Sequence, residues 1–189
     1  MSAPDGFTLA LPDDWVTLDL DTATAAASRR RLVDALARDD PVVAEARRGV
    51  EKLLAAAATG AVEDGALLCA LRFDVDAEGR PVQATVSVVI RSLDGSSEPS
   101  ALRAELAEVG GEAEVVELTS GPALRLSGQT EDGFLSLGVL VPVPGVDGRV
   151  AVVSLLSPSL THEVELNEFF DAVADTFSFT WNTDEEAAR

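Results

Sequence analysis

The side chains that carry most metal and nucleophile chemistry are scarce in this chain of 189 residues. It has one cysteine, one histidine and no tyrosine. Cys69 cannot form a disulfide within the chain, and its apolar context ALLCAL predicts a buried, inert thiol. A metal site with two histidines is excluded. His162 follows Thr161 at the start of a predicted helix, which favours a capping or neutral histidine over a general base.

Sequence motifs for catalysis are also missing. The serines near the histidine, Ser154, Ser157 and Ser159, are not in a G-x-S-x-G elbow. Gly110-Gly111 follows a predicted helix instead of opening one, which is the wrong polarity for a phosphate loop. The acidic stretch from Asp74 to Gly79 resembles a calcium loop, but its twelfth position is Thr85 and not a glutamate. We therefore predict no enzyme, no catalytic residue, no cofactor and no metal.

Positive charge is scarce as well. The chain has 14 Lys and Arg against 33 Asp and Glu, a net charge of −19, and Lys52 is its single lysine. Such a surface repels nucleic acids and anionic membranes. It leaves three roles open for the acidity: binding a protein partner with a basic surface, binding a cationic ligand, or keeping the chain soluble. Arginine in place of lysine, with abundant alanine and valine, is typical of GC-rich actinobacteria, so part of the acidity reflects genome composition.

Long apolar runs are absent, and this bears on location. The apolar segments are strand-sized and interrupted by Gly, Pro and Ser, too short for membrane insertion. The first fifteen residues contain neither a basic n-region nor an apolar h-region. A cytoplasmic location is therefore expected.

The apolar residues that are present predict one α+β domain over residues 1–181, followed by a disordered polar tail over 182–189. Alternating patterns predict strands at 7–11, 15–20, 65–74, 81–92, 112–118 and 123–129, and a long hairpin within 133–159. Helical periodicity predicts helices at 97–109 and 161–177, and a helical insertion over 22–60 in two parts that break at Pro41. We expect Gly60 to end the insertion and Ser97 to cap the third helix. Hairpin-length links imply a mostly antiparallel sheet flanked by helices.

Basic residues gather once, at Arg29-Arg30-Arg31 in the first predicted helix. Three consecutive residues cover nearly a full helical turn. We therefore expect these side chains to spread around the helix and not to form one patch.

Two turns are candidate partner-binding surfaces. In the first, Trp15 adjoins the carboxylates of Asp13 and Asp14, and the tryptophan is either an interface anchor or a core residue below the turn. The second is an apolar hairpin tip, which is either a proline-stiffened turn or an exposed contact point. Its candidate residues are Pro142, Val143, Pro144, Val146 and Asp147.

Three segments together carry a family resemblance: FTLALPDDW near the N-terminus, the hairpin LVPVPGVDGRVAVVSLLSPS, and the closing FFDAVADTFSF. They resemble the Mog1p/PsbP-like α/β/α sandwich group, strongly over 112–181 and also at 7–20. The group includes a Ran-binding protein, photosystem extrinsic subunits, bacterial lipoproteins and immunity-like proteins, most of which act by binding. No functional residue of the group has a counterpart here, and the lipoprotein cysteine is missing.

The resemblance and the missing catalytic set imply a non-enzymatic protein-interaction module, an accessory or assembly factor of a larger bacterial system such as secretion machinery. A narrower version is an immunity protein that neutralises a basic toxin. The alternative is a small-ligand binder that uses a pocket between sheet and helices. A subunit of a homo-oligomer is a further possibility.

Overall fold

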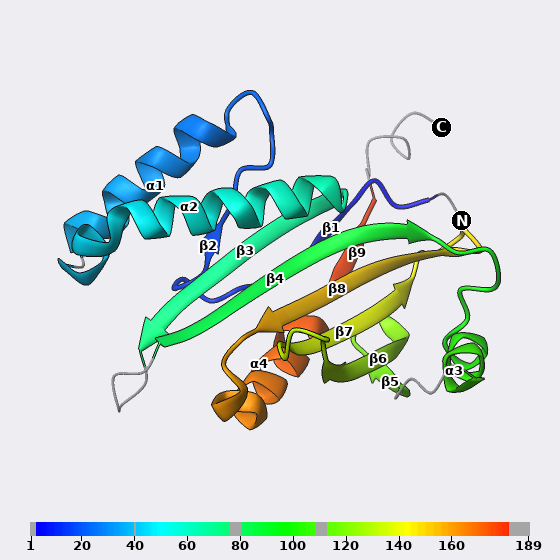
Figure 1. The fold of residues 1–189 in the computed structure, drawn as a ribbon. Coiled ribbons are helices and arrows are strands. Elements are labelled where there is room, and N and C mark those ends of the chain that lie inside the picture. Colours follow the sequence, from blue (N-terminus) through cyan, green and yellow to red (C-terminus); the bar gives the residue numbers. More distant parts are fainter. Residues whose placement is uncertain (1–2, 40, 76–80, 109–112, 182–189) are drawn as a thin grey trace, which may run out of the picture.

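A computed structural model describes residues 3–39, 41–75, 81–108 and 113–181 of the chain. Its main feature is a seven-stranded sheet in which every neighbouring pair of strands is antiparallel (Figure 1). From edge to edge the strands are β2 (Val16–Thr17), β3 (Ala66–Val75), β4 (Pro81–Ser92), β8 (Arg149–Ser157), β7 (Leu135–Pro142), β6 (Gly121–Gln129) and β5 (Ala113–Leu118). The predicted tail, the calcium-like loop beyond Val75 and Gly110-Gly111 lie outside the described residues.

Four helices and a two-stranded ribbon cover this sheet. The helices are α1 (Ala25–Asp39), α2 (Pro41–Glu63), α3 (Pro99–Glu108) and α4 (Glu163–Asp175), the last preceded by a short 3-10 turn at Leu160–His162. The ribbon brings together two segments that lie far apart in the sequence, because β1 (Gly6–Thr8) pairs antiparallel with β9 (Ser178–Thr180). The predicted α+β class and the mostly antiparallel sheet are confirmed.

The two faces of the sheet bury different sets of alternate residues. On one face, Ala70, Val86 and Val153 pack with α4 and with the β1–β9 ribbon in the largest apolar cluster. On the other face, Cys69 and Leu71 pack under α1 and α2. Leu124 and Val150 belong to that second face too, and they pack under Leu102 of α3. Helices therefore cover both faces of the sheet. Toward one edge α2 runs beside β3, and toward the other edge α3 and α4 lie near β5–β7 (Figure 1).

Gly60 does not end α2, so that prediction is wrong. The helix continues to Glu63 because Ala61, only 9% exposed, still packs into the cluster beneath the helix. The chain leaves the helix at Gly65, whose φ of 69° lies in the left-handed region that glycine adopts without strain. Its N–H donates to the carbonyl of Val62 at 3.0 Å.

Ser97 does not cap α3 either. It is buried, and its hydroxyl lies 3.4 Å from a carboxylate oxygen of Asp147. The cap is Glu98, whose Oε2 accepts hydrogen bonds from the N–H groups of Ser100 and Ala101 at 3.0 and 3.1 Å. Hydrogen bonds from the Ser100 hydroxyl and the Ala101 N–H lower the pKa of Glu98. The side chain that caps α3 is therefore the carboxylate of Glu98 and not the hydroxyl of Ser97, which the sequence pattern predicts.

The lone cysteine is buried as predicted. Cys69 is 1% exposed on β3, under α1 and α2. Desolvation raises the pKa of its thiol to about 11, because the apolar surroundings disfavour the thiolate. None of the helices in the described ranges combines the length and the apolar character that crossing a bilayer requires.

Candidate binding sites

The turn before β2 does not present its tryptophan to solvent. Trp15 is 8% exposed and stacks on Phe169 of α4, with ring centroids 5.2 Å apart and planes 3° from parallel. This placement corresponds to the core alternative for Trp15. Asp13 and Asp14 are exposed, and Asp14 Oδ2 lies 2.9 Å from Nε of Arg72 on β3. Only the two carboxylates of this candidate surface are available to a partner.

The tip of the β7–β8 hairpin turns its apolar side chains inward. Val143 is 8% exposed and belongs to the main core, and Val146 packs against that core. The N–H of Val146 donates to the carbonyl of Val143 at 3.2 Å across Pro144 and Gly145, and Gly145 has a φ of 75°, as a type II turn requires. This geometry corresponds to the proline-stiffened turn. Pro142 is half-buried at the end of β7, which leaves Asp147 as the exposed side chain among the candidates.

The serines near His162 make hydrogen bonds that hold neighbouring backbone segments together. His162 occupies the N-cap position of α4, but its side chain makes no capping hydrogen bond. The hydroxyl of buried Ser157 donates to the carbonyl of Gln83 at 2.5 Å. It also accepts from the N–H of Ser159 at 3.0 Å, while the Gln83 N–H donates to Oγ of Ser159 at 3.2 Å. These serines tie the end of β8 to β4, and their hydrogen bonds serve that connection.

A groove that the sequence did not reveal lies between the sheet and α4. It has a volume of about 450 Å³, which is within the usual size range of ligand sites. We call it the acidic groove. Its floor and walls come from β5, β6, β7 and α4: Glu114, Val116, Glu117, Leu118, Arg125, Val139, Asp171, Ala174 and Asp175.

The one arginine of the acidic groove is already engaged. Arg125 of β6 donates from Nε to Asp171 Oδ1 at 2.7 Å, and from Nη2 to Asp171 Oδ2 at 3.3 Å and Asn167 Oδ1 at 2.6 Å. The arginine side chain is 17% exposed and that of Asp171 52%. Bidentate contact of this kind fixes the guanidinium, so it joins the sheet to α4 and offers little charge to a ligand.

Two carboxylates of the acidic groove remain without a cation. Glu114 lies directly opposite Arg125 in the β5–β6 register, but among the described residues it forms no ion pair. Glu117 borders the acidic groove and forms no ion pair either, but alternation along β5 places its side chain on the face opposite to Glu114, Val116 and Leu118. Both glutamates are exposed. Asp175 likewise has no cation among the described residues, because the N–H and hydroxyl of Thr119 that donate to it at 2.7 and 3.1 Å are neutral. The acidic groove can therefore attract a cationic group to its β5 side.

Within the described ranges, no cluster of three or more His, Cys, Asp or Glu side chains is arranged to hold a metal ion. The acidic groove has its carboxylates spread along its length, and its floor is apolar, formed by half-buried Val116 and by Val139, which is 1% exposed. Such an arrangement suits an amphipathic cation better than a bare ion.

The comparisons with known proteins bear on the fold. No protein-family model matches the sequence, and a comparison with curated proteins finds no match. Among solved structures, the solution structure of cyanobacterial PsbP (CyanoP) from Synechocystis sp. PCC 6803 is similar to this chain. The two are 14% identical with a TM-score of 0.46, over 93% of this chain and 87% of that one. This similarity concerns the fold alone and carries no argument about function.

Proposed function

We propose that this chain is a non-enzymatic protein-interaction module, an accessory factor of a larger bacterial system, and that the acidic groove receives a basic segment of its partner. The observation that carries this proposal is the state of the charges in the acidic groove. Its arginine is bound to Asp171 and Asn167, while Glu114 and Asp175 have no cation among the described residues. A lysine or arginine of a partner would supply the missing charge.

The position of the acidic groove supports a peptide as the ligand. β5 is the outermost strand of the sheet and pairs only with β6 among the described strands. An extended segment can add to such an edge through main-chain hydrogen bonds and place alternate side chains over the neighbouring surface. Glu114 and Val116 both lie on this strand and line the acidic groove. An extended segment that carries basic and apolar side chains in alternation fits both features.

The test is a titration of the ¹⁵N-labelled chain with three unstructured ten-residue peptides, alternating Lys-Val, Gln-Val and Glu-Val, at 0.1 M salt. The Lys-Val peptide is expected to shift amide signals of β5 and of the C-terminal half of α4 saturably. The Gln-Val and Glu-Val peptides should leave those signals unchanged. Shifts that scatter over the whole acidic surface, or no saturable shift with the basic peptide, would overturn the proposal.

Matched variants separate the acidic groove from the general acidity of the chain. Glu114→Gln with Asp175→Asn removes two charges from the acidic groove. Glu131→Gln with Asp132→Asn removes two charges from an exposed turn before β7. The first variant is expected to weaken binding of the basic peptide by roughly 10-fold, as expected for two surface charge contacts of about 0.7 kcal/mol each. Equal weakening in the second variant would contradict a specific role for the acidic groove.

A small amphipathic cation is a second candidate ligand, because a groove of about 450 Å³ can hold one without a protein attached. Hexylamine in place of the peptide tests this. If hexylamine binds as tightly as the peptide, the chain is a small-ligand binder. An immunity protein that binds a basic toxin is a narrower form of the peptide proposal and gives the same result in both assays.

A further inference from the structure

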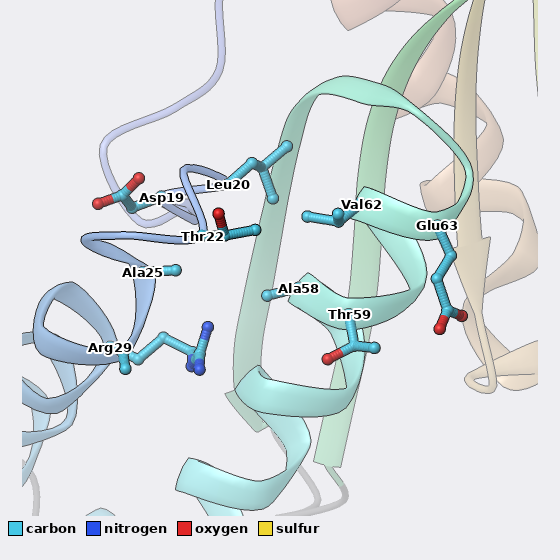
Figure 2. Close-up of a pocket in the computed structure, with 10 residues that line it drawn as sticks. Asp19, Leu20, Thr22, Ala25, Arg29, Ala58, Thr59, Val62 and Glu63 are labelled. Atoms are coloured by element: carbon cyan, nitrogen blue, oxygen red, sulfur yellow. The ribbon is translucent and has the colours of Figure 1, made fainter.

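A second pocket lies at the opposite edge of the molecule, between α1 and α2 (Figure 2). Its volume is about 330 Å³, enough for roughly ten water-sized groups at about 30 Å³ each. We call it the arginine pocket. Its lining comes from the segment before α1, from the first turns of α1 and from the end of α2: Asp19, Leu20, Thr22, Ala25, Ala26, Arg29, Ala58, Thr59, Val62 and Glu63.

The arginine pocket exists because small residues face each other across the helix pair. Ala25 of α1 and Ala58 of α2 are buried, and their methyl groups leave the space between the helices open. Leu20 and Val62 add apolar surface, and Val62 is 42% exposed although it is a large aliphatic residue. Figure 2 shows the Leu20 and Val62 side chains directed toward each other at one end of the arginine pocket.

Arg29 supplies a positive charge at the other end. Its side chain extends from α1 toward Ala58 and Thr59 of α2 (Figure 2) and is half-buried, whereas Arg30 and Arg31 are exposed and do not line the arginine pocket. Ion pairs between described residues use other arginines, and within the described ranges Arg29 makes no ion pair and no hydrogen bond. A guanidinium that has lost part of its hydration and gained no partner is free to receive an anion.

The acidic residues of the arginine pocket do not neutralise this charge. The carboxylate of Asp19 accepts from the N–H of Asp21 at 3.0 Å and from the hydroxyl of Thr24 at 2.7 Å, so it organises the chain before α1. Glu63 is exposed, and in Figure 2 its carboxylate extends away from the other lining side chains. The hydroxyls of Thr22 and Thr59 make no hydrogen bond to other described residues and can serve a bound ligand.

We infer that the arginine pocket binds a carboxylate that carries a small aliphatic group. The carboxylate would accept two parallel hydrogen bonds from the guanidinium of Arg29, with the threonine hydroxyls nearby. The aliphatic group would cover Leu20 and Val62. Two sources share this chemistry: a free short-chain carboxylic acid, and the C-terminus of a peptide that ends in a residue such as leucine. The inference does not depend on the acidic groove.

The experiment titrates the ¹⁵N-labelled full chain with hexanoate, with N-acetyl-Ala-Leu and with N-acetyl-Ala-Leu amide. Both carboxylates are expected to shift the amide signals of Ala26, Thr59 and Val62 saturably, with dissociation constants of roughly millimolar size for ligands this small. The amide should bind at least ~10-fold more weakly, because it lacks the charge. Tighter binding of the peptide acid identifies a peptide C-terminus as the source, and equal or tighter binding of hexanoate identifies a free acid.

Variants test the residues. Arg29→Gln is expected to weaken carboxylate binding at least ~10-fold, Val62→Thr to weaken hexanoate binding by about 3-fold, and the neighbouring Arg30→Gln to change neither. Among the described residues Arg29 has no partner to lose, so its variant should melt within a few degrees of the parent. Equal binding of acid and amide by the parent chain, or equal losses in Arg29→Gln and Arg30→Gln, would overturn the inference.

Discussion

Arg125 in the acidic groove is held by Asp171 and Asn167, and Glu114 on β5 beside it has no cation among the described residues. In the arginine pocket, Asp19 accepts hydrogen bonds from the neutral N–H of Asp21 and hydroxyl of Thr24, and the cation Arg29 makes no ion pair or hydrogen bond within the described ranges. Both regions lie on one chain with a net charge of −19. The comparison teaches that net charge does not determine what a site attracts, since local pairing decides which charge is left for a ligand.

Charge reversal in the acidic groove should have the largest effect. Glu114→Arg with Asp175→Arg turns two attractions into two repulsions, so we expect the affinity for the Lys-Val peptide to fall roughly 100-fold, as expected for a change of about 2.7 kcal/mol. Hexanoate binding in the arginine pocket should change less than about 2-fold, because the two sites lie at opposite edges of the sheet. Isothermal titration calorimetry measures both affinities. A parallel loss of both would show that the two sites are not independent.

The two arginines should differ clearly in their contribution to stability. Arg125→Met leaves Asp171 and Asn167 without their partner and is expected to lower the free energy of unfolding by roughly 1–3 kcal/mol. Arg29→Met removes no ion pair or hydrogen bond between described residues and should change the free energy of unfolding by less than about 0.5 kcal/mol. Urea unfolding followed by tryptophan fluorescence gives both values. Equal values for the two variants would remove the basis of the comparison.

The salt dependence of ligand binding should also differ between the two sites, but by a smaller factor. Between 0.1 M and 1 M salt the screening length falls from about 10 Å to about 3 Å. Peptide binding over the exposed carboxylates of the acidic groove is expected to weaken about 10-fold over this range. Hexanoate binding to half-buried Arg29 should weaken only about 3-fold, because the apolar contact with Val62 is not screened. Titrations of the parent chain at both salt concentrations test this, and a stronger salt dependence in the arginine pocket would be the contrary result.

Alkaline pH probes the apolar cluster that underlies the arginine pocket, since Cys69 and Ala58 belong to the same cluster. Burial raises the pKa of the Cys69 thiol to about 11 from its ordinary value of 9.0. The folded state therefore holds the proton longer than the unfolded state. The stabilising contribution of the protonated Cys69 thiol is complete below pH about 9 and is lost as the pH rises through about 11. The difference in unfolding free energy between the parent and Cys69→Ala should shrink over this interval, and a constant difference would contradict a dry cluster.

Local sequence patterns predicted much of the fold. The strand predicted at 81–92 coincides with β4, and the one at 65–74 differs from β3 by a residue at each end. These strands carry regular alternation bounded by turn residues, so local information suffices. The local pattern predicted the wrong role for Gly60 and Ser97, because burial in the folded chain determined where α2 ends and which side chain caps α3.

The two binding sites could not be predicted from local sequence patterns, and the reason is physical. Glu114, Arg125 and Asp171 come together only through the β5–β6 register and the placement of α4 on the sheet, which local patterns do not specify. For the arginine pocket the sequence did offer one signal. The spread of Arg29-Arg30-Arg31 around the helix was expected, and Arg29 is the one that turns inward. Which of the three would do so depends on the packing of α2.

The most direct test of the account is one competition experiment on the parent chain. The Lys-Val peptide is added to saturation, N-acetyl-Ala-Leu is then titrated in, and amide signals of both regions are followed. We predict that the basic peptide shifts β5 and the C-terminal half of α4, that the acid shifts Ala26, Thr59 and Val62, and that neither displaces the other. Displacement of one ligand by the other, or shifts of both ligands in the same region, would contradict two sites of opposite charge preference.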